Sequence, residues 1–206
     1  MKPTAIVDHL LETVSPVACA REIARVQEAP QYYPGEMVYQ HDLKFNPISS
    51  GNIRSYEVLG QDAEMVYMLN AAGSSGFVFA EADLRGPLHD VVPVMSVLLR
   101  DTGIKGYKQA YRLRIRQSFS RRSVATRWYM AYVTHHKGIV SDFEHLEGGK
   151  SLWRSLVSYA AERGATASLV DTSTGTWTPV NAQTPDSAIW SEDEQLKRNV
   201  LVLEIL

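Results

Sequence analysis

The chain has 206 residues, of which 45% are hydrophobic and 21% are charged. These are ordinary values for a globular protein, and the length is sufficient to bury a core without support from a metal or from disulfides. The formal net charge of −2 is too small to predict a strongly acidic or basic partner from the total alone. The single cysteine, Cys19, excludes an internal disulfide and any multi-cysteine metal site, so a reducing compartment is expected.

Targeting signals are not evident in the sequence. Asp8, Glu12 and Glu22 interrupt the first 27 residues, where a secretory leader would be apolar. The sequence also lacks a run of about 18 apolar residues, which a membrane-spanning helix would need. We therefore expect a cytoplasmic protein with no membrane partner and no bound metal.

The N-terminal half predicts helices first and strands afterwards. Residues 1–28 carry two short helical patterns of apolar residues, separated at Ser15 and Pro16, which predict a helical hairpin. A helix interrupted by Pro93 is predicted over Leu88–Leu99. A hairpin loop is predicted over Asn70–Gly76, and a helix over Asp62–Ala72 is the alternative to a strand there. The predicted strands are Met37–Gln40, Ser55–Leu59, Glu64–Leu69 and Phe77–Ala80.

The stretch from Trp128 onward predicts the centre of the fold. Trp128–Val133 is apolar on both faces of an extended chain, which predicts a covered central strand. His135 to Gly138 predicts a hairpin turn, with Gly138–Ser141 as the returning strand. Apolar residues at helical spacing predict a helix over Leu152–Ala160 that ends by Gly164. A strand over Ala165–Asp171 follows, so the helix is a crossover between two strands of a sheet.

The C-terminal residues complete the predicted fold. Thr172–Asp186 predicts an ordered loop, Ser191–Glu194 suits the start of a helix, and Asn199–Leu206 predicts a buried strand. The sequence therefore predicts a single α+β domain over residues 1–206. Its mixed, mostly antiparallel central sheet is flanked by helices, and residues 1–28 form an N-terminal helical extension.

The clearest local anomaly in charge is a cluster of arginines. Gln109–Phe119 alternates as a strand with an apolar face and a guanidinium face. Such a ladder could bind nucleic-acid phosphates or another anion, with nearby aromatic side chains stacking on bases. The alternative is a solvated face that pairs with acidic residues of adjacent strands. The arginines of this anion-binding hypothesis are Arg112, Arg114, Arg116, Arg121 and Arg122.

Gly149, Lys150 and Ser151 stand at the start of the predicted crossover helix, where backbone N–H groups can bind an anion. A Walker A loop would also need a glycine five positions before Gly149. That position is Glu144, whose carboxylate would repel phosphate. Nucleoside-triphosphate hydrolysis is therefore not favoured.

A different anion fits this segment better. Residues 146–153, followed by the helix, Gly164 and the strand, resemble the cofactor loop and following helix of the GNAT N-acyltransferases. The resemblance covers residues 127–172 and extends to the last strand. In that family, a basic, glycine-rich turn at the splayed end of a central strand binds the pyrophosphate of coenzyme A through backbone N–H groups.

The resemblance implies a cofactor, acetyl-CoA or another acyl-CoA. It also implies four residues that hold the pyrophosphate: Gly148, Gly149, Lys150 and Ser151. The residues taken alone leave an alternative, in which the glycines only mark the start of a helix and the charged side chains around them lie in solvent.

Asp142, Glu144 and His145 form a dense titratable cluster after the strand predicted at Gly138–Ser141. Ligands of open α/β sheets bind at the carboxyl ends of strands, so a general base could come from this cluster. The alternative is that these residues cap the turn. His135 and His136 would point to opposite faces of a strand, which makes a shared metal ion unfavourable.

Three functional hypotheses follow. The first is a GNAT-like transferase that moves an acyl group from acyl-CoA to an amine or hydroxyl of a small molecule or protein. The second is a non-catalytic accessory factor that binds nucleic acid or protein through the arginine ladder. The third is a degenerate fold that has lost the cofactor.

Overall fold

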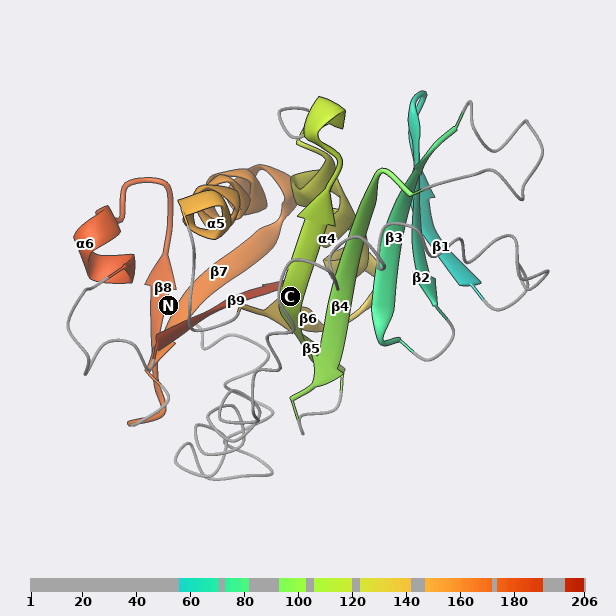
Figure 1. The fold of residues 1–206 in the computed structure, drawn as a ribbon. Coiled ribbons are helices and arrows are strands. Elements are labelled where there is room, and N and C mark those ends of the chain that lie inside the picture. The colour runs from blue at the N-terminus through green and yellow to red at the C-terminus, as the bar shows by residue number, and fades with distance from the viewer. Residues whose placement is uncertain are drawn as a thin grey trace, which may run out of the picture. The chain divides into compact units, whose positions relative to one another are not determined.

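The computed structural model describes residues 56–70, 73–81, 93–102, 106–119, 123–141, 147–171, 174–190 and 199–205. These residues fall into two compact units. The N-terminal unit comprises the described residues up to 100 together with 110–135, and the C-terminal unit comprises those of 101–109 and 136–205. Strand β5 (Tyr107–Ile115), which is labelled in Figure 1, belongs to both units: its first three residues lie in the C-terminal unit and the others in the N-terminal unit.

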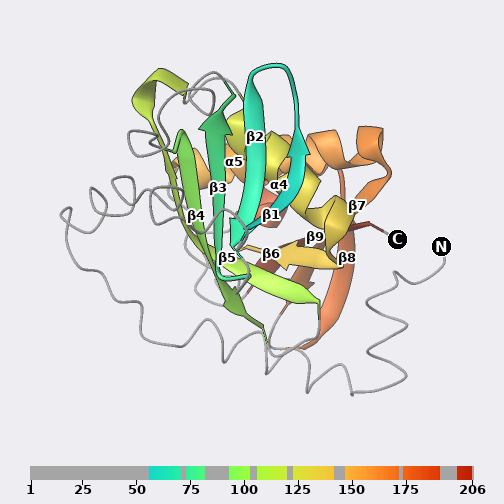
Figure 2. The ribbon, with the colours of Figure 1, turned by 90° about the vertical axis from the view of Figure 1, so that its right-hand side faces the viewer.

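The N-terminal unit contains a sheet whose strands follow the order β1-β2-β3-β4-β5. The pairs β1/β2, β2/β3 and β3/β4 are antiparallel (Figure 2). Asn70 closes the turn between β2 and β3, because its Oδ1 accepts the N–H groups of Ser74 at 2.8 Å and Ser75 at 2.9 Å. The first four strands of this sheet are Tyr56–Gln61 (β1), Met65–Asn70 (β2), Ser75–Ala80 (β3) and Met95–Asp101 (β4).

These strands confirm the strands predicted at Ser55–Leu59, Glu64–Leu69 and Phe77–Ala80. The alternative helix over Asp62–Ala72 is wrong, because β2 pairs with a strand on each side. The helix over Leu88–Leu99 is also wrong within the described residues, since Met95–Leu99 lies in β4. Pairing with β3 and burial of the alternating apolar side chains of β4 outweigh helical spacing there.

Trp128–Val133 does not form the predicted strand; it lies inside helix α4 (Val124–His135). A short run that is apolar all round fits a buried helix as well as a buried strand, so periodicity alone misleads. Trp128 is fully buried and stacks on Tyr132 one helical turn later, with ring centroids 5.4 Å apart. Its Nε1–H donates to the carbonyl of Met68 at 3.1 Å.

The hairpin predicted at His135–Gly138 is wrong for the same reason. His135 is the last residue of α4, and the short strand that follows, β6 (Gly138–Val140), runs parallel to β5. The strand predicted at Gly138–Ser141 is therefore confirmed, but it is not the return of a hairpin.

The C-terminal unit contains a sheet with the order β5-β6-β9-β7-β8. Within it, β5 and β6 are parallel and the other neighbouring pairs are antiparallel. The sheet is therefore mixed, as predicted for an α+β fold, and the buried strand predicted at the end of the chain is confirmed. Its other strands are Ala165–Asp171 (β7), Thr176–Val180 (β8) and Asn199–Ile205 (β9).

The predicted loop Thr172–Asp186 contains β8, which pairs with β7, and is wrong to that extent. Gly175, with φ of 75°, makes the turn between the two strands. Threonine and tryptophan at alternate positions then suit an edge strand. A short helix, α6 (Asp186–Ile189), follows it.

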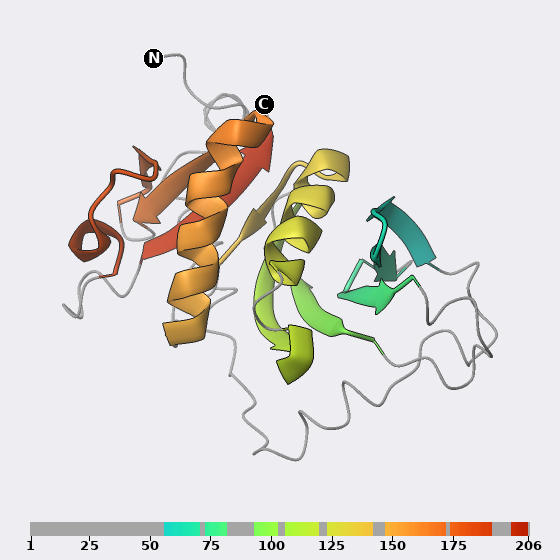
Figure 3. The same ribbon diagram turned by 90° about the horizontal axis from the view of Figure 1, so that it is seen from above.

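The predicted crossover helix is confirmed as α5 (Glu147–Ala160), continued by the 3-10 turn η5 (Ala161–Arg163) and ended by Gly164 with φ of 70°. Strands β6 and β7 are both antiparallel to β9, so they are parallel to each other and α5 connects them across β9. The helix packs on β7 and β9 (Figure 3). Its buried side chains are Trp153, Leu156, Val157 and Ala160.

Some expectations fall outside the described residues. They are the helical hairpin of residues 1–28, the strand Met37–Gln40 and the helix start at Ser191–Glu194. None of the described helices is long and apolar enough to cross a membrane.

The burial of Trp128 predicts a large loss of stability on truncation. We expect Trp128→Ala to cost about 3–5 kcal/mol in free energy of unfolding, since it removes a buried aromatic side chain and leaves a cavity. Trp177→Ala is the matched control, because Trp177 is half-buried on strand β8. Urea denaturation measures both variants, and equal losses would contradict the packing of α4 described above.

Candidate functional site

Two helices begin after the carboxyl ends of parallel strands, a common location for ligand sites in sheets with helical connections. Helix α4 follows β5, and helix α5 follows β6. The first N–H groups of a helix lack partners within the helix and carry a partial positive charge, so each start is able to hold an anion. The two starts differ in the charges around them.

The four predicted pyrophosphate-binding residues lie inside the first turns of α5, not in a loop before it. Gly148 and Ser151 are exposed, and Gly149 and Lys150 are half-buried. A β-carbon added to Gly148 would meet nothing within 4 Å, so packing does not require glycine there. The candidate bases that precede this helix, Asp142, Glu144 and His145, lie outside the described residues.

The start of α4 is built from the end of β5. Arg116 directly follows β5, and its N–H donates to the carbonyl of Val94 at 2.9 Å. A 3-10 turn, η4 (Gln117–Phe119), comes next, and Ser123 then adopts a positive φ of 52° before α4 begins. The first turn of α4 contains no acidic residue, so no carboxylate of its own offsets the positive end of the helix.

The arginine ladder is only partly as predicted. Arg112 and Arg114 lie on β5 and Arg116 follows it, but residues 111–116 are half-buried on both faces. The predicted strand is therefore confirmed as far as Ile115, but its apolar side is half-buried and is not the predicted core face. Arg114 donates to the carbonyl of Leu113 at 2.9 Å, and Arg121 and Arg122 lie outside the described residues.

A polar network joins the turn between β1 and β2 to the first turns of α4. The carboxylate of Asp62 accepts the Tyr67 hydroxyl at 2.5 Å and pairs with Arg127 at 2.7 Å. Its other oxygen accepts the N–H groups of Glu64 and Met65, both at 2.9 Å. Arg127 is thereby fixed four residues into α4.

This network shifts the pKa values of both acids. Burial alone would raise the pKa of Asp62, but hydrogen bonds from Tyr67, Glu64 and Met65 and the charge of Arg127 outweigh it and lower the pKa. Burial, followed by the hydrogen bond to Asp62, raises the pKa of Tyr67. The carboxylate is therefore ionised and the phenol protonated at neutral pH.

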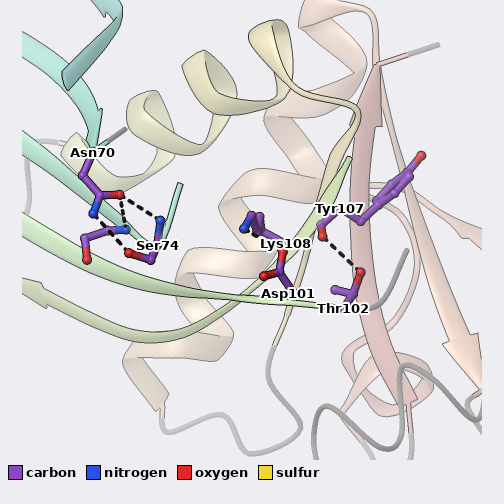
Figure 4. Close-up of polar contacts among 7 residues, drawn as sticks. Asn70, Ser74, Asp101, Thr102, Tyr107 and Lys108 are labelled. Atoms are coloured by element: carbon purple, nitrogen blue, oxygen red, sulfur yellow. Dashed lines mark hydrogen bonds and ion pairs between the residues drawn. The ribbon is translucent and has the colours of Figure 1, made fainter. Parts of the chain in front are cut away.

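The C-terminal unit contains a buried pair of polar side chains. The Tyr107 hydroxyl donates to Oε2 of Glu204 at 3.0 Å, and Glu204 is only 1% exposed. Thr102 donates to the carbonyl of Tyr107 at 3.0 Å, and Lys108 pairs with Asp101 at 2.7 Å nearby (Figure 4). A carboxylate buried in the middle of a sheet needs such partners, because desolvation penalises its charge.

Several buried and half-buried polar residues of the structure were not identified from the sequence as candidates for a functional site. Glu204 offered a signal, since it is a single acidic residue in the apolar run of β9. Gln109 and Asp62 offered no signal in the sequence, because their hydrogen-bond partners include residues that only the fold brings close to them. His135 was expected in a hairpin turn, and it instead lies at the end of α4 with Nδ1 3.8 Å from Oε1 of Glu57.

Comparison with known proteins found no matching family model, curated protein or solved structure. Among the described residues, no group of three or more His, Cys, Asp or Glu side chains is placed to hold a metal ion.

The lowered pKa of Asp62 predicts an acid-dependent contribution to stability. In the unfolded chain the carboxyl has its ordinary pKa, near 3.8. The contribution is therefore fully present above that pH and is lost as the pH falls through the lower folded value. We expect Asp62→Asn to destabilise the protein at pH 7, with the difference from wild type shrinking below about pH 4. Urea denaturation at several pH values measures this, and a difference that does not change with pH would contradict it.

Proposed function

We propose that this chain is an acyl-CoA-dependent N-acyltransferase that moves an acyl group to an amine or hydroxyl acceptor. The observation that carries the proposal is the path of β5. This strand is the parallel partner of β6, and it leads through Arg116 into a helix whose first turn has no acidic residue. We place the coenzyme A pyrophosphate at this start of α4.

Charge distinguishes the two helix starts. In the sequence, Arg121 and Arg122 precede α4, whereas Asp142 and Glu144 precede α5, and Glu147 is its first residue. Pyrophosphate carries negative charge. The basic segment before α4 attracts that charge, and the acidic segment before α5 repels it. The residues Gly148 to Ser151 are therefore the second candidate for the pyrophosphate.

The resemblance to the GNAT N-acyltransferases is carried by residues 146–153 and so favours the start of α5, but one property of that family also fits the start of α4. In that family the pyrophosphate-binding turn is basic and stands at the splayed end of a central strand. Here the β5/β6 ladder ends at Gln109, whereas β5 continues to Ile115. The basic segment that follows β5 stands where such a turn would be expected.

The candidates for the general base are the titratable residues Asp142, Glu144 and His145. In the proposed reaction the nitrogen of the acceptor attacks the thioester carbonyl, a C–N bond forms and the C–S bond breaks. One proton passes from the amine to a base drawn from Asp142, Glu144 and His145, and the same proton is then returned to the leaving sulfur, so coenzyme A leaves as the thiol.

The two helix starts can be separated by mutation. We expect Arg116→Gln to weaken coenzyme A binding about tenfold or more, as for the loss of a hydrogen bond from a charged group. Gly149→Glu should leave the affinity unchanged if the anion lies at α4. Arg163→Gln, at an exposed arginine of η5, is the control for a general loss of positive charge. Isothermal titration with coenzyme A measures each affinity.

The opposite result would move the site. A folded Gly149→Glu variant that no longer binds coenzyme A, together with a normal Arg116→Gln variant, would assign the pyrophosphate to Gly148, Gly149, Lys150 and Ser151. A wild-type protein with no affinity for coenzyme A would refute the proposed function altogether.

The partial exposure of Arg112, Arg114 and Arg116 favours a second candidate function. In this alternative the chain is a non-catalytic accessory factor that binds nucleic acid or protein through the basic end of β5. Guanidinium groups suit phosphate binding, because their planar N–H groups match its oxygen atoms.

The triple change of Arg112, Arg114 and Arg116 to Gln tests this alternative. If these residues bind phosphates, the variant should bind short DNA and RNA more weakly and with a shallower salt dependence. The logarithmic salt slope should fall by close to one unit for each phosphate that the variant no longer neutralises. Fluorescence anisotropy over a range of salt concentrations measures both effects. A wild-type protein that binds neither at low salt would eliminate nucleic acid as the partner.

A further inference from the structure

The parallel pairing of β5 with β6 ends at Gln109, which is opposite Val140. Ser141, which directly follows β6, is bound to β9: its N–H donates to the carbonyl of Leu201 at 2.8 Å, and its Oγ accepts the Leu201 N–H at 2.9 Å. The carbonyl of Ser141 accepts Nε2 of Gln109 at 3.0 Å. A side chain thus continues the link between the two strands beyond the point where their ladder ends.

This hydrogen bond also fixes the orientation of the Gln109 carboxamide. A carbonyl oxygen can only accept, so the nitrogen of the amide must face Ser141 and Oε1 must point elsewhere. Gln109 is 1% exposed, and Oε1 is buried with no hydrogen-bond partner in the part of the chain that the structure describes. Buried acceptors nearly always accept a hydrogen bond, so Oε1 of Gln109 has the capacity to accept one from a donor outside the described residues.

The location suggests what that donor is. Gln109 stands at the carboxyl-terminal end of the β5/β6 ladder, and ligands bind at such ends. A neutral carboxamide oxygen favours an uncharged N–H or O–H group, since burying an unpaired cation beside it would cost much more.

We infer that Oε1 of Gln109 accepts a hydrogen bond from an uncharged N–H or O–H donor of the bound ligand, an inference that rests on the proposed acyl-CoA function. Two parts of that reaction carry such donors: the amide groups of acyl-CoA and the amine or hydroxyl nucleophile of the acceptor. A carboxamide does not take up a proton at neutral pH, so Gln109 binds and orients the donor and the general base is a different residue.

The experiment compares two changes on the same strand. Gln109→Met keeps the length of the side chain and removes its hydrogen bonds. Tyr107→Phe is the matched control, because it also removes one buried side-chain hydrogen bond of β5, the one to Glu204. Titration with acetyl-CoA measures the affinity, and thiol release from acetyl-CoA in the presence of ethanolamine, which carries both an amine and a hydroxyl, measures the reaction.

We expect Gln109→Met to lose about tenfold in one of the two measurements, while Tyr107→Phe stays within about twofold of wild type in both. Weaker binding of acetyl-CoA would assign the donor to the cofactor. Unchanged binding with slower thiol release would assign it to the nucleophile. Should Gln109→Met fail to fold, Gln109→Asn keeps the carboxamide but shortens its reach, and the same outcomes apply.

Two results would overturn the inference, and they are distinguishable. If wild type binds acetyl-CoA and a folded Gln109 variant equals the Tyr107→Phe control in affinity and thiol release, Gln109 has only a structural role and the proposed function stands. If wild type does not bind acetyl-CoA, the proposed function fails and the inference fails with it.

Discussion

The C-terminal unit depends on the absence of a side chain at Gly138. This residue pairs with Tyr107 on one side and with Glu204 on the other. The Tyr107 ring crosses it to reach the carboxylate of Glu204, and a β-carbon on Gly138 would lie 2.3 Å from that ring. A shift of one residue in either strand would place a side chain under the ring, so this contact fixes the register of β5, β6 and β9 together.

That register determines where the parallel ladder stops. With Tyr107 opposite Gly138, the last pair is Gln109 with Val140, and Ser141 is left to bind β9. The buried acceptor of Gln109 is therefore a consequence of the packing around Gly138. A buried polar pair adds little net stability, but breaking it by removing one partner is costly, which suits a role in specifying one alignment of strands.

The crossover helix and the last strand were predicted correctly because their patterns had one interpretation. The crossover helix α5 shows helical spacing with a glycine at its end, and β9 is a long apolar run. Trp128–Val133 was misassigned because a run that is apolar on every side has no period. The contacts of Trp128 with Met68 and Gly76, which bury this helix, involve residues distant in the chain. The sequence offered no signal for Gln109, because the burial of its side chain and its hydrogen bond to Ser141 depend on residues distant in the chain.

The position of β9 has a consequence for how the C-terminal unit folds. This strand follows β6 and β7 in the chain, yet it lies between them and is hydrogen-bonded to both. During synthesis, β6, α5 and β7 emerge from the ribosome before the strand that joins them. Until β9 is made, β6 and β7 each have one unpaired edge, and the side of α5 that packs on β9 is uncovered. Exposed edges of this kind are sites of incorrect pairing, and contacts between distant residues form slowly. Because β9 is hydrogen-bonded to both β6 and β7, the sheet of the C-terminal unit is complete only when this strand has paired.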